Sequence, residues 1–127
     1  MKLLLDTSVL IDVLRRRGQR REFVSELARA GHVLSTTMLN VAEVYAGMRA
    51  GEEPDAEALF VGLHLYELSG RSARLAGKLK NAWSRKGRTL TLADTIVAAI
   101  AIEHECQLLT DNQKHFPMPE IQLFPLP

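Results

Sequence analysis

Short apolar runs alternate along the chain with longer stretches in which apolar residues recur at helical spacing. An apolar run of four to eight residues is typical of a strand covered on both faces, and a 3.6-residue period is typical of a helix. The expected strands are Lys2–Leu5, His32–Ser35, Leu65–Leu68, Gln107–Thr110 and Ile121–Phe124. The expected helices run from Val9 to about Arg16, from about Arg20 to Ala30, from Thr36 or Thr37 to about Arg49, from Ala56 to about Gly62, from Ser69 or Gly70 to about Arg85, and from Thr91 or Asp94 to about Glu105.

This alternation predicts an α/β fold with a mostly parallel central sheet of four to five strands, flanked by helices on both sides. In such sheets, binding sites lie beyond the carboxyl ends of the strands. Asp6 follows the first expected strand and Asp111 follows a late one. Both are therefore expected at the same edge of the sheet.

Composition narrows the class of protein only modestly. The 127 residues fit one domain, and 16 basic against 15 acidic residues give a net charge of +1. Any nucleic-acid-binding patch must therefore be local. The single cysteine, Cys106, excludes an internal disulfide. No apolar run is long enough to span a membrane, and Asp6 and Asp12 interrupt the apolar start, so we expect a cytoplasmic protein without a signal peptide.

Four acidic residues stand in apolar surroundings: Asp6, Glu43, Asp94 and Asp111. Taken singly, Asp6 and Asp94 have a simple alternative role as helix caps, Glu43 as part of a solvated helix face, and Asp111 as part of a turn. Taken together, they suggest one pocket. Carboxylates about 6 Å apart repel by roughly 3 kcal/mol per pair, so a cation is needed to neutralise them. An all-oxygen ligand set suits Mg²⁺ or Mn²⁺, and the lack of His and Cys at ligand spacing argues against zinc.

Four segments carry a family resemblance. LLLDTSVLID, NVAEVYAGMR, LADTIVAAIA and LLTDNQKHF resemble the PIN-domain ribonucleases, and the short form of the chain resembles the VapC toxins of bacterial toxin–antitoxin pairs. The similarity spans nearly the whole chain, with all four acids in the family's order. The resemblance implies a PIN-like fold in which residues 1–127 form a single PIN domain.

The resemblance also implies roles for residues. Asp6 and Asp94 would bind the metal directly, Glu43 directly or through water, and Asp111 would complete the acidic pocket. Behind them, Thr7, Ser8, Thr110 and Asn112 would hold waters or a phosphate. The ion would activate a water that cuts the RNA backbone and would offset the charge that builds on the phosphate.

Partners are implied as well. An antitoxin would place a basic side chain in the acidic pocket, and the free toxin would be a homodimer. We expect Arg85, Lys86 and Arg88, which precede the Asp94 helix, to contact RNA phosphates, although the wet face of an amphipathic helix explains them equally well. The cluster Arg15, Arg16, Arg17, Arg20 and Arg21 is expected to be solvated surface, and His115 a surface or packing residue.

Three other functions compete with the nuclease. A PIN fold that only binds RNA remains the main alternative. A phosphohydrolase of the haloacid dehalogenase type also has an Asp after its first strand, but it needs a second Asp where this chain has Ser8. A response-regulator-like module needs adjacent acids and a late lysine that the local sequence does not supply. Replacing Asp94 by Asn, combined with metal titration, separates a nuclease from a binder.

Overall fold

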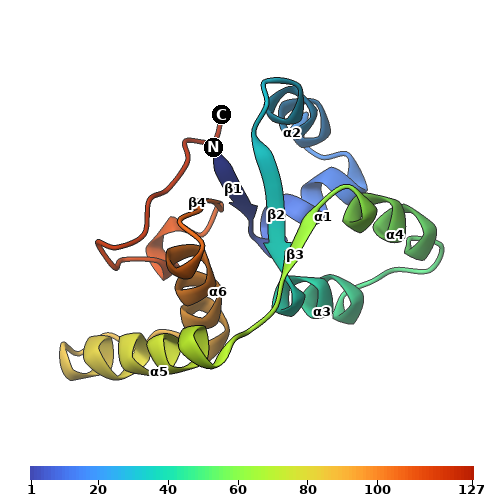
Figure 1. Ribbon diagram of the computed structural model, residues 1–127. Helices are drawn as coiled ribbons and strands as arrows, with labels where there is room; N and C mark the ends of the chain where they lie inside the picture. Colours follow the sequence, from blue (N-terminus) through green and yellow to red (C-terminus); the bar gives the residue numbers. More distant parts are fainter.

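The computed structural model describes all 127 residues and contains one parallel sheet with the strand order β3-β2-β1-β4 (Figure 1). The strands are β1 (Lys2–Leu5), β2 (Val33–Thr37), β3 (His64–Tyr66) and β4 (Gln107–Leu109). The helices are α1 (Thr7–Arg15), α2 (Arg20–Arg29), α3 (Met38–Ala46), α4 (Glu53–Val61), α5 (Gly70–Arg85) and α6 (Leu92–Glu103), and a 3₁₀ turn, η1, covers Gln113–His115. The expected α/β fold with helices on both sides is confirmed.

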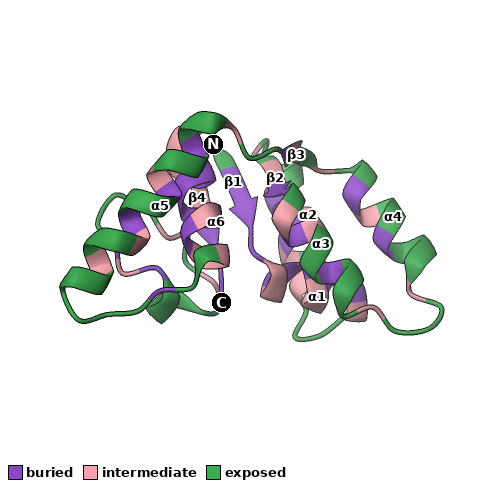
Figure 2. Cartoon of the chain, turned by 90° about the horizontal axis from the view of Figure 1, so that it is seen from below, coloured by how far each residue is buried: buried purple, intermediate pink, exposed green.

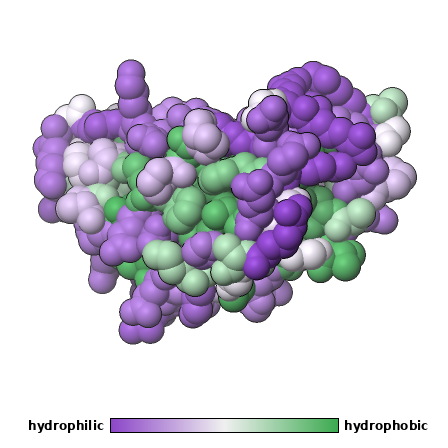
Figure 3. All heavy atoms as spheres, turned by 90° about the horizontal axis from the view of Figure 1, so that it is seen from above, coloured by the Kyte–Doolittle hydropathy of each residue, from purple (hydrophilic) through white to green (hydrophobic).

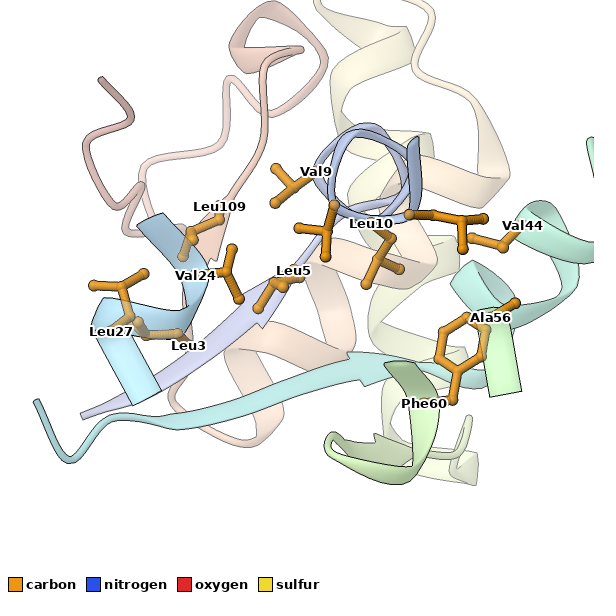
Figure 4. Packing of buried hydrophobic residues seen from close by; sticks show 12 residues of the cluster. Leu3, Leu5, Val9, Leu10, Val24, Leu27, Val44, Ala56, Phe60 and Leu109 are labelled. Atoms are coloured by element: carbon orange, nitrogen blue, oxygen red, sulfur yellow. The ribbon is translucent and has the colours of Figure 1, made fainter. Parts of the chain in front are cut away.

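Each face of the sheet carries its own apolar core. Because successive side chains of a strand point to opposite faces, Leu3 and Leu5 of β1 pack on one side and Leu4 on the other. Figure 4 shows the first core, in which β1 lies beneath Val9 and Leu10 of α1, with residues of α2 and α4 alongside. The second core joins the sheet to α5 and α6, the pair of helices on the left of Figure 1. The strongly apolar α6 is buried from Val97 to Ala101, as its sequence predicts.

The strand order places a topological switch between β1 and β4, where chain connections diverge to opposite faces of the sheet. Ligands bind outside the carboxyl ends of strands at such a point. The backbone N–H of Asp6 donates to the carbonyl of Leu109 at 2.9 Å, so the two strand ends lie side by side. Figure 2 views the molecule from this edge. Figure 3 views the opposite end, where apolar atoms gather between hydrophilic flanks.

Several predicted boundaries are wrong. β2 continues through Thr36 and Thr37, because these residues pair with Leu65 and Tyr66 of β3. α3 stops at Gly47 rather than near Arg49, α4 begins earlier with Pro54 in its first turn, and β3 ends at Tyr66.

The predicted last strand, Ile121–Phe124, is also wrong. It contributes only an isolated bridge between Leu108 and Leu123. Pro119 and Pro125 flank this segment and cannot donate to a ladder, so pairing does not extend. The sheet therefore has four strands, the lower of the two expected numbers. None of the helices is both long and apolar enough to span a bilayer.

Candidate active site

Asp6 is the centre of the site. It directly follows β1, and its side chain is almost fully enclosed, with 6% of the residue's surface exposed. It occupies the N-cap position of α1, yet its carboxylate makes no capping hydrogen bond to that helix. Instead, Oδ1 accepts from Nδ2 of Asn40 at 3.1 Å, and Oδ2 accepts from the hydroxyl of Thr110 at 2.7 Å. The carboxylate therefore bridges the ends of three strands rather than capping a helix.

Burial raises the pKa of Asp6 above its ordinary value. The Thr110 hydroxyl opposes this rise, and the negative charge of nearby Asp94 adds to it. Burial and the charge of Asp94 thus both favour the protonated form of this carboxyl group. A bound cation would reverse this balance and favour the ionised form.

Asn40 is the residue that sequence reasoning missed. It is completely buried near the start of α3, where a capping box holds it: Asn40 N–H donates to the Thr37 hydroxyl at 3.2 Å, and that hydroxyl donates to Asn40 Oδ1 at 2.7 Å. With its oxygen fixed in this way, the amide nitrogen is directed at Asp6 and at the Thr7 hydroxyl, 2.9 Å away. The available signal was a polar residue on an apolar helix, one turn before Glu43 and on the same face.

Glu43 joins the site through Thr7. The Thr7 hydroxyl, which accepts from Asn40, donates to Oε1 of Glu43 at 2.6 Å. Glu43 itself lies on the exposed side of α3, so its second oxygen remains open to solvent. A continuous chain of hydrogen bonds therefore runs from Asp6 through Asn40 and Thr7 to Glu43.

Asp94 comes from the other face of the sheet. Thr91 caps α6 by accepting from the backbone N–H of Asp94 at 3.1 Å, so the alternative in which Asp94 is itself the cap is wrong. The Asp94 side chain is 22% exposed, and its Oδ2 lies 3.3 Å from Nδ1 of His115. His115 is a surface residue, as one of the two expectations has it, and its side chain lies against a candidate ligand.

Asp111 points elsewhere. Its side chain is 41% exposed, and Oδ1 accepts a charge-assisted hydrogen bond from Nη2 of Arg20 at 2.7 Å. The Asp111 backbone N–H donates to Ser8 Oγ at 3.4 Å, and Asn112 N–H donates to the Thr110 hydroxyl at 3.0 Å. Ser8 and Thr110 therefore shape the turn that follows β4. The Arg20 side chain is only 11% exposed, so the expectation that it belongs to a solvated surface is wrong.

The four carboxylates do not form one compact cluster, and no group of three or more His, Cys, Asp or Glu side chains is close enough to hold a metal ion as they stand. The structure brings Asp6, Thr7, Asn40, Glu43 and Thr110 into one hydrogen-bonded network, with Asp94 adjoining. Asp111 lies beside this network and pairs with Arg20. Asp6, Glu43 and Asp94 would each offer a carboxylate oxygen to a metal ion. Oxygen ligands of this kind suit a hard divalent cation.

The three basic residues expected to contact RNA take different positions. Arg85 lines a polar hollow on α5 together with Arg74, Lys78 and Asn81. Lys86 lies over the ring of Trp83, 4.6 Å from its centroid. Arg88 donates to the backbone carbonyl of Lys114, so it already holds the segment that follows Asp111.

Comparison with known proteins gives the class. The family model of the PIN domain matches residues 3–118. The chain therefore belongs to the PIN-domain family. Ribonuclease VapC19 of Mycobacterium tuberculosis is 32% identical over 120 residues, which cover 94% of this chain and 96% of the relative. Ribonuclease VapC10 of the same organism is 32% identical over 116 residues, covering 91% and 86%.

Solved structures agree on the fold. VapBC2 from Rickettsia felis, bound to a DNA fragment of its promoter, superposes with a TM-score of 0.84 at 21% identity, covering 98% of both chains. VapBC-1 from nontypeable Haemophilus influenzae gives a TM-score of 0.81 at 20% identity, covering 98% of this chain and 97% of that one. PIN-domain ribonucleases of the VapC type are metal-dependent. The predicted resemblance is thus confirmed.

Proposed function

We propose that this protein is a metal-dependent endoribonuclease and the toxin of a toxin–antitoxin pair. The observation that carries the proposal is the buried Asp6, held by Asn40 and Thr110 at the switch point of the sheet, in a chain that matches Ribonuclease VapC19 over almost its whole length. Burying a charged carboxylate costs folding free energy unless a partner neutralises it, and residues with a perturbed pKa cluster at functional sites.

Asp6 and Asp94 would hold the ion, with Glu43 as a third ligand, directly or through water. Mg²⁺ is the expected ion and Mn²⁺ the alternative, since both prefer oxygen ligands. When bound, it would supply a water nucleophile and offset charge on the phosphate. The chain's own contribution is positioning. Asn40 and Thr110 fix the two oxygens of Asp6, and Thr7 fixes one oxygen of Glu43, so that these groups need little rearrangement on binding.

We propose a supporting role for the remaining predicted residues. Asp111 borders the pocket and reaches the ion only if it leaves Arg20, while Ser8, Thr110 and Asn112 hold the turn in which Asp111 sits. Arg85 would bind RNA phosphates beside the site, and binding would weaken with added salt. Lys86 and Arg88 would contribute through Trp83 and the Lys114 carbonyl rather than as free cations.

The partner would be an antitoxin, as in the VapBC structures that share the fold. We propose that its basic side chain enters the acidic pocket, and the Arg20–Asp111 pair supports this because a guanidinium already binds a carboxylate of this region.

We further propose that residues 1–127 act as one domain and that the free toxin is a homodimer. It would work in the cytoplasm, where the buried free Cys106 would stay reduced.

Cleavage of total RNA tests the proposal. Purified protein is incubated with RNA, with and without Mg²⁺ or Mn²⁺, and the new ends are mapped. We expect discrete cleavage only with metal, its loss in Asp94→Asn, and its retention in Asp55→Asn, a matched change on the exposed surface of α4. RNA binding without metal-dependent cleavage by a folded protein would instead identify a non-catalytic RNA-binding module.

Growth tests the toxin role separately. Expression of the chain alone should arrest growth of a bacterial host, and co-expression of the protein encoded beside it should restore growth. Normal growth with folded, abundant protein would contradict the toxin role while leaving the nuclease activity to the cleavage assay.

A further inference from the structure

Arg20 is an arginine of α2 whose side chain reaches the acidic edge of the sheet from within the chain. Its guanidinium donates through Nη2 to Asp111 at 2.7 Å, across 91 residues of sequence. The other terminal nitrogen, Nη1, is buried and has no hydrogen-bond partner. Because an unpaired buried donor costs free energy, this arrangement is not the one that stability alone would select.

The turn before α2 directs Arg20 to this place. Arg16, Gly18 and Gln19 all adopt left-handed conformations, with φ of 55°, 57° and 58°. Two of the three are not glycine, so the backbone accepts a cost of roughly 1 kcal/mol or more at each of them. This sharp reversal begins α2 at Arg20 and brings its side chain beneath the turn that follows β4.

The segment that carries Asp111 is held at both ends by arginines from other elements. Arg20 binds the side chain of Asp111, and Arg88 binds the carbonyl of Lys114. Next to Lys114, His115 contacts Asp94. The orientation of Asp111 relative to Asp6 and Asp94 is therefore set by Arg20 rather than by solvent.

We propose that Arg20 is a positioning residue that competes with the divalent ion for Asp111. It holds this carboxylate outside the ligand set, so that the ion is bound mainly by Asp6, Asp94 and Glu43, and with a weaker affinity than the charge of the region would allow. The inference rests on the metal site of the proposed function. It predicts that removing Arg20 tightens metal binding instead of weakening it.

Titration with Mn²⁺ in the absence of RNA tests the role of Arg20, with the free ion measured by electron paramagnetic resonance. Arg20→Met should bind Mn²⁺ roughly fivefold more tightly, the effect expected when the freed Asp111 carboxylate attracts a divalent ion through well-solvated surroundings. Arg20→Gln also removes the charge and should tighten Mn²⁺ binding to a similar extent, so it replaces Arg20→Met if that variant folds poorly. Arg20→Lys, which keeps the charge, should stay within about twofold of the wild type.

Two controls separate this from a general charge effect. Arg21→Met removes the same charge from the next position of α2, where the side chain lines a groove with Asp55, and should leave Mn²⁺ affinity unchanged. In an Asp111→Asn background, Arg20→Met should have no further effect, because the carboxylate through which Arg20 acts is gone.

The outcomes distinguish this inference from the proposed function. If Asp6→Asn weakens Mn²⁺ binding but Arg20→Met leaves it unchanged, weakens it, or tightens it equally with and without Asp111, the metal site stands and the role of Arg20 is refuted. If the folded wild type binds no Mn²⁺ at all, the metal site itself is refuted, and the role of Arg20 with it.

Discussion

The carboxylate of Asp6 is buried although its charged form is disfavoured there. It is buried, its pKa is raised first by desolvation and further by Asp94, and the donors that bind its oxygens are neutral. A protein selected only for stability would place a neutral side chain there. Binding of a cation at the proposed site would relieve this conflict.

Asp6→Asn should stabilise the metal-free protein while abolishing RNA cleavage. The amide keeps an acceptor for Asn40, and its nitrogen can donate to the Thr110 hydroxyl, but it carries no charge. We expect the melting temperature in EDTA at pH 7 to rise by a few degrees, since about 1 kcal/mol shifts it by roughly 2–6 °C in a domain of this size. A lower melting temperature would mean that the hydrogen bonds to the carboxylate outweigh its desolvation.

The same comparison has a defined pH dependence. A raised pKa means that the folded state binds the Asp6 proton more tightly than the unfolded chain, so the contribution of this group to stability falls as the pH rises between the ordinary and the raised pKa. The advantage of Asp6→Asn over the wild type should therefore be present at pH 7 and shrink on acidification. Melting curves of both proteins across pH 4 to 8 measure it, and an advantage that grows toward low pH would contradict it.

Asn40→Ala should have the opposite effect on stability. It removes a fully buried amide that bonds Thr37, Thr7 and Asp6, and it leaves Asp6 Oδ1 without its donor and the Thr37 hydroxyl without its acceptor. The expected loss is about 2–3 kcal/mol in urea unfolding. Asn81→Ala, on the outer surface of α5, is the matched control and should cost less than about 0.5 kcal/mol.

These residues mark the limit of sequence reasoning. Asp6 and Asp94 are recognisable because each stands where a buried strand ends or a buried helix begins. Asn40 and Arg20 were not recognised as parts of the site, because nothing local separates Asn40 from a capping residue or Arg20 from its neighbouring arginines. Their roles depend on contacts across 34 and 91 residues, which only the folded chain creates.

Among the elements, α6 matters most because its start places Asp94. Thr91 caps this helix, and the cap bond is made to the backbone of Asp94 itself. The apolar run Val97–Ala101 predicted the helix. The sequence left open whether Thr91 or Asp94 accepts the capping hydrogen bond from the backbone. In the folded chain Thr91 binds the backbone, while the Asp94 side chain lies against His115.

Thr91→Ala should therefore weaken both the helix and the site. Loss of an N-cap costs about 0.5–2 kcal/mol, and the first turn that carries Asp94 should become less well ordered. We expect lower stability in urea and weaker Mn²⁺ binding. Thr91→Ser, which keeps the hydroxyl, should restore both, and restoration of stability without restoration of Mn²⁺ binding would contradict the coupling of this cap to Asp94.

Across the whole molecule, the site joins the two halves that the sheet separates. Asp6, Asn40 and Glu43 belong to the side covered by α1 to α4, and Asp94 belongs to the side covered by α5 and α6. A ligand bound by residues from both sides stabilises the two halves together against unfolding.

The overall architecture was predictable because it follows from alternating strands and helices. The fifth strand was predicted wrongly because an apolar segment between prolines resembles a strand.

Mg²⁺ or Mn²⁺ should accordingly raise the melting temperature of the wild type, and EDTA should reverse the effect. At a free concentration about a hundredfold above its dissociation constant, an ion bound only by the folded state contributes roughly 2.7 kcal/mol. Asp94→Asn should respond much less. An equal response of both proteins would place the ion outside the proposed site.

The pairing of β1 with β4 has a consequence for the biosynthesis of a destructive enzyme. Residue 6 cannot meet its partner at position 110 until translation has passed that position, because the bond between them joins residues 104 positions apart. A nascent chain that has already formed its first three strands still lacks one wall of the pocket. The hydrogen-bonded setting of Asp6 is therefore completed late in synthesis, after the strands that precede β4 have emerged.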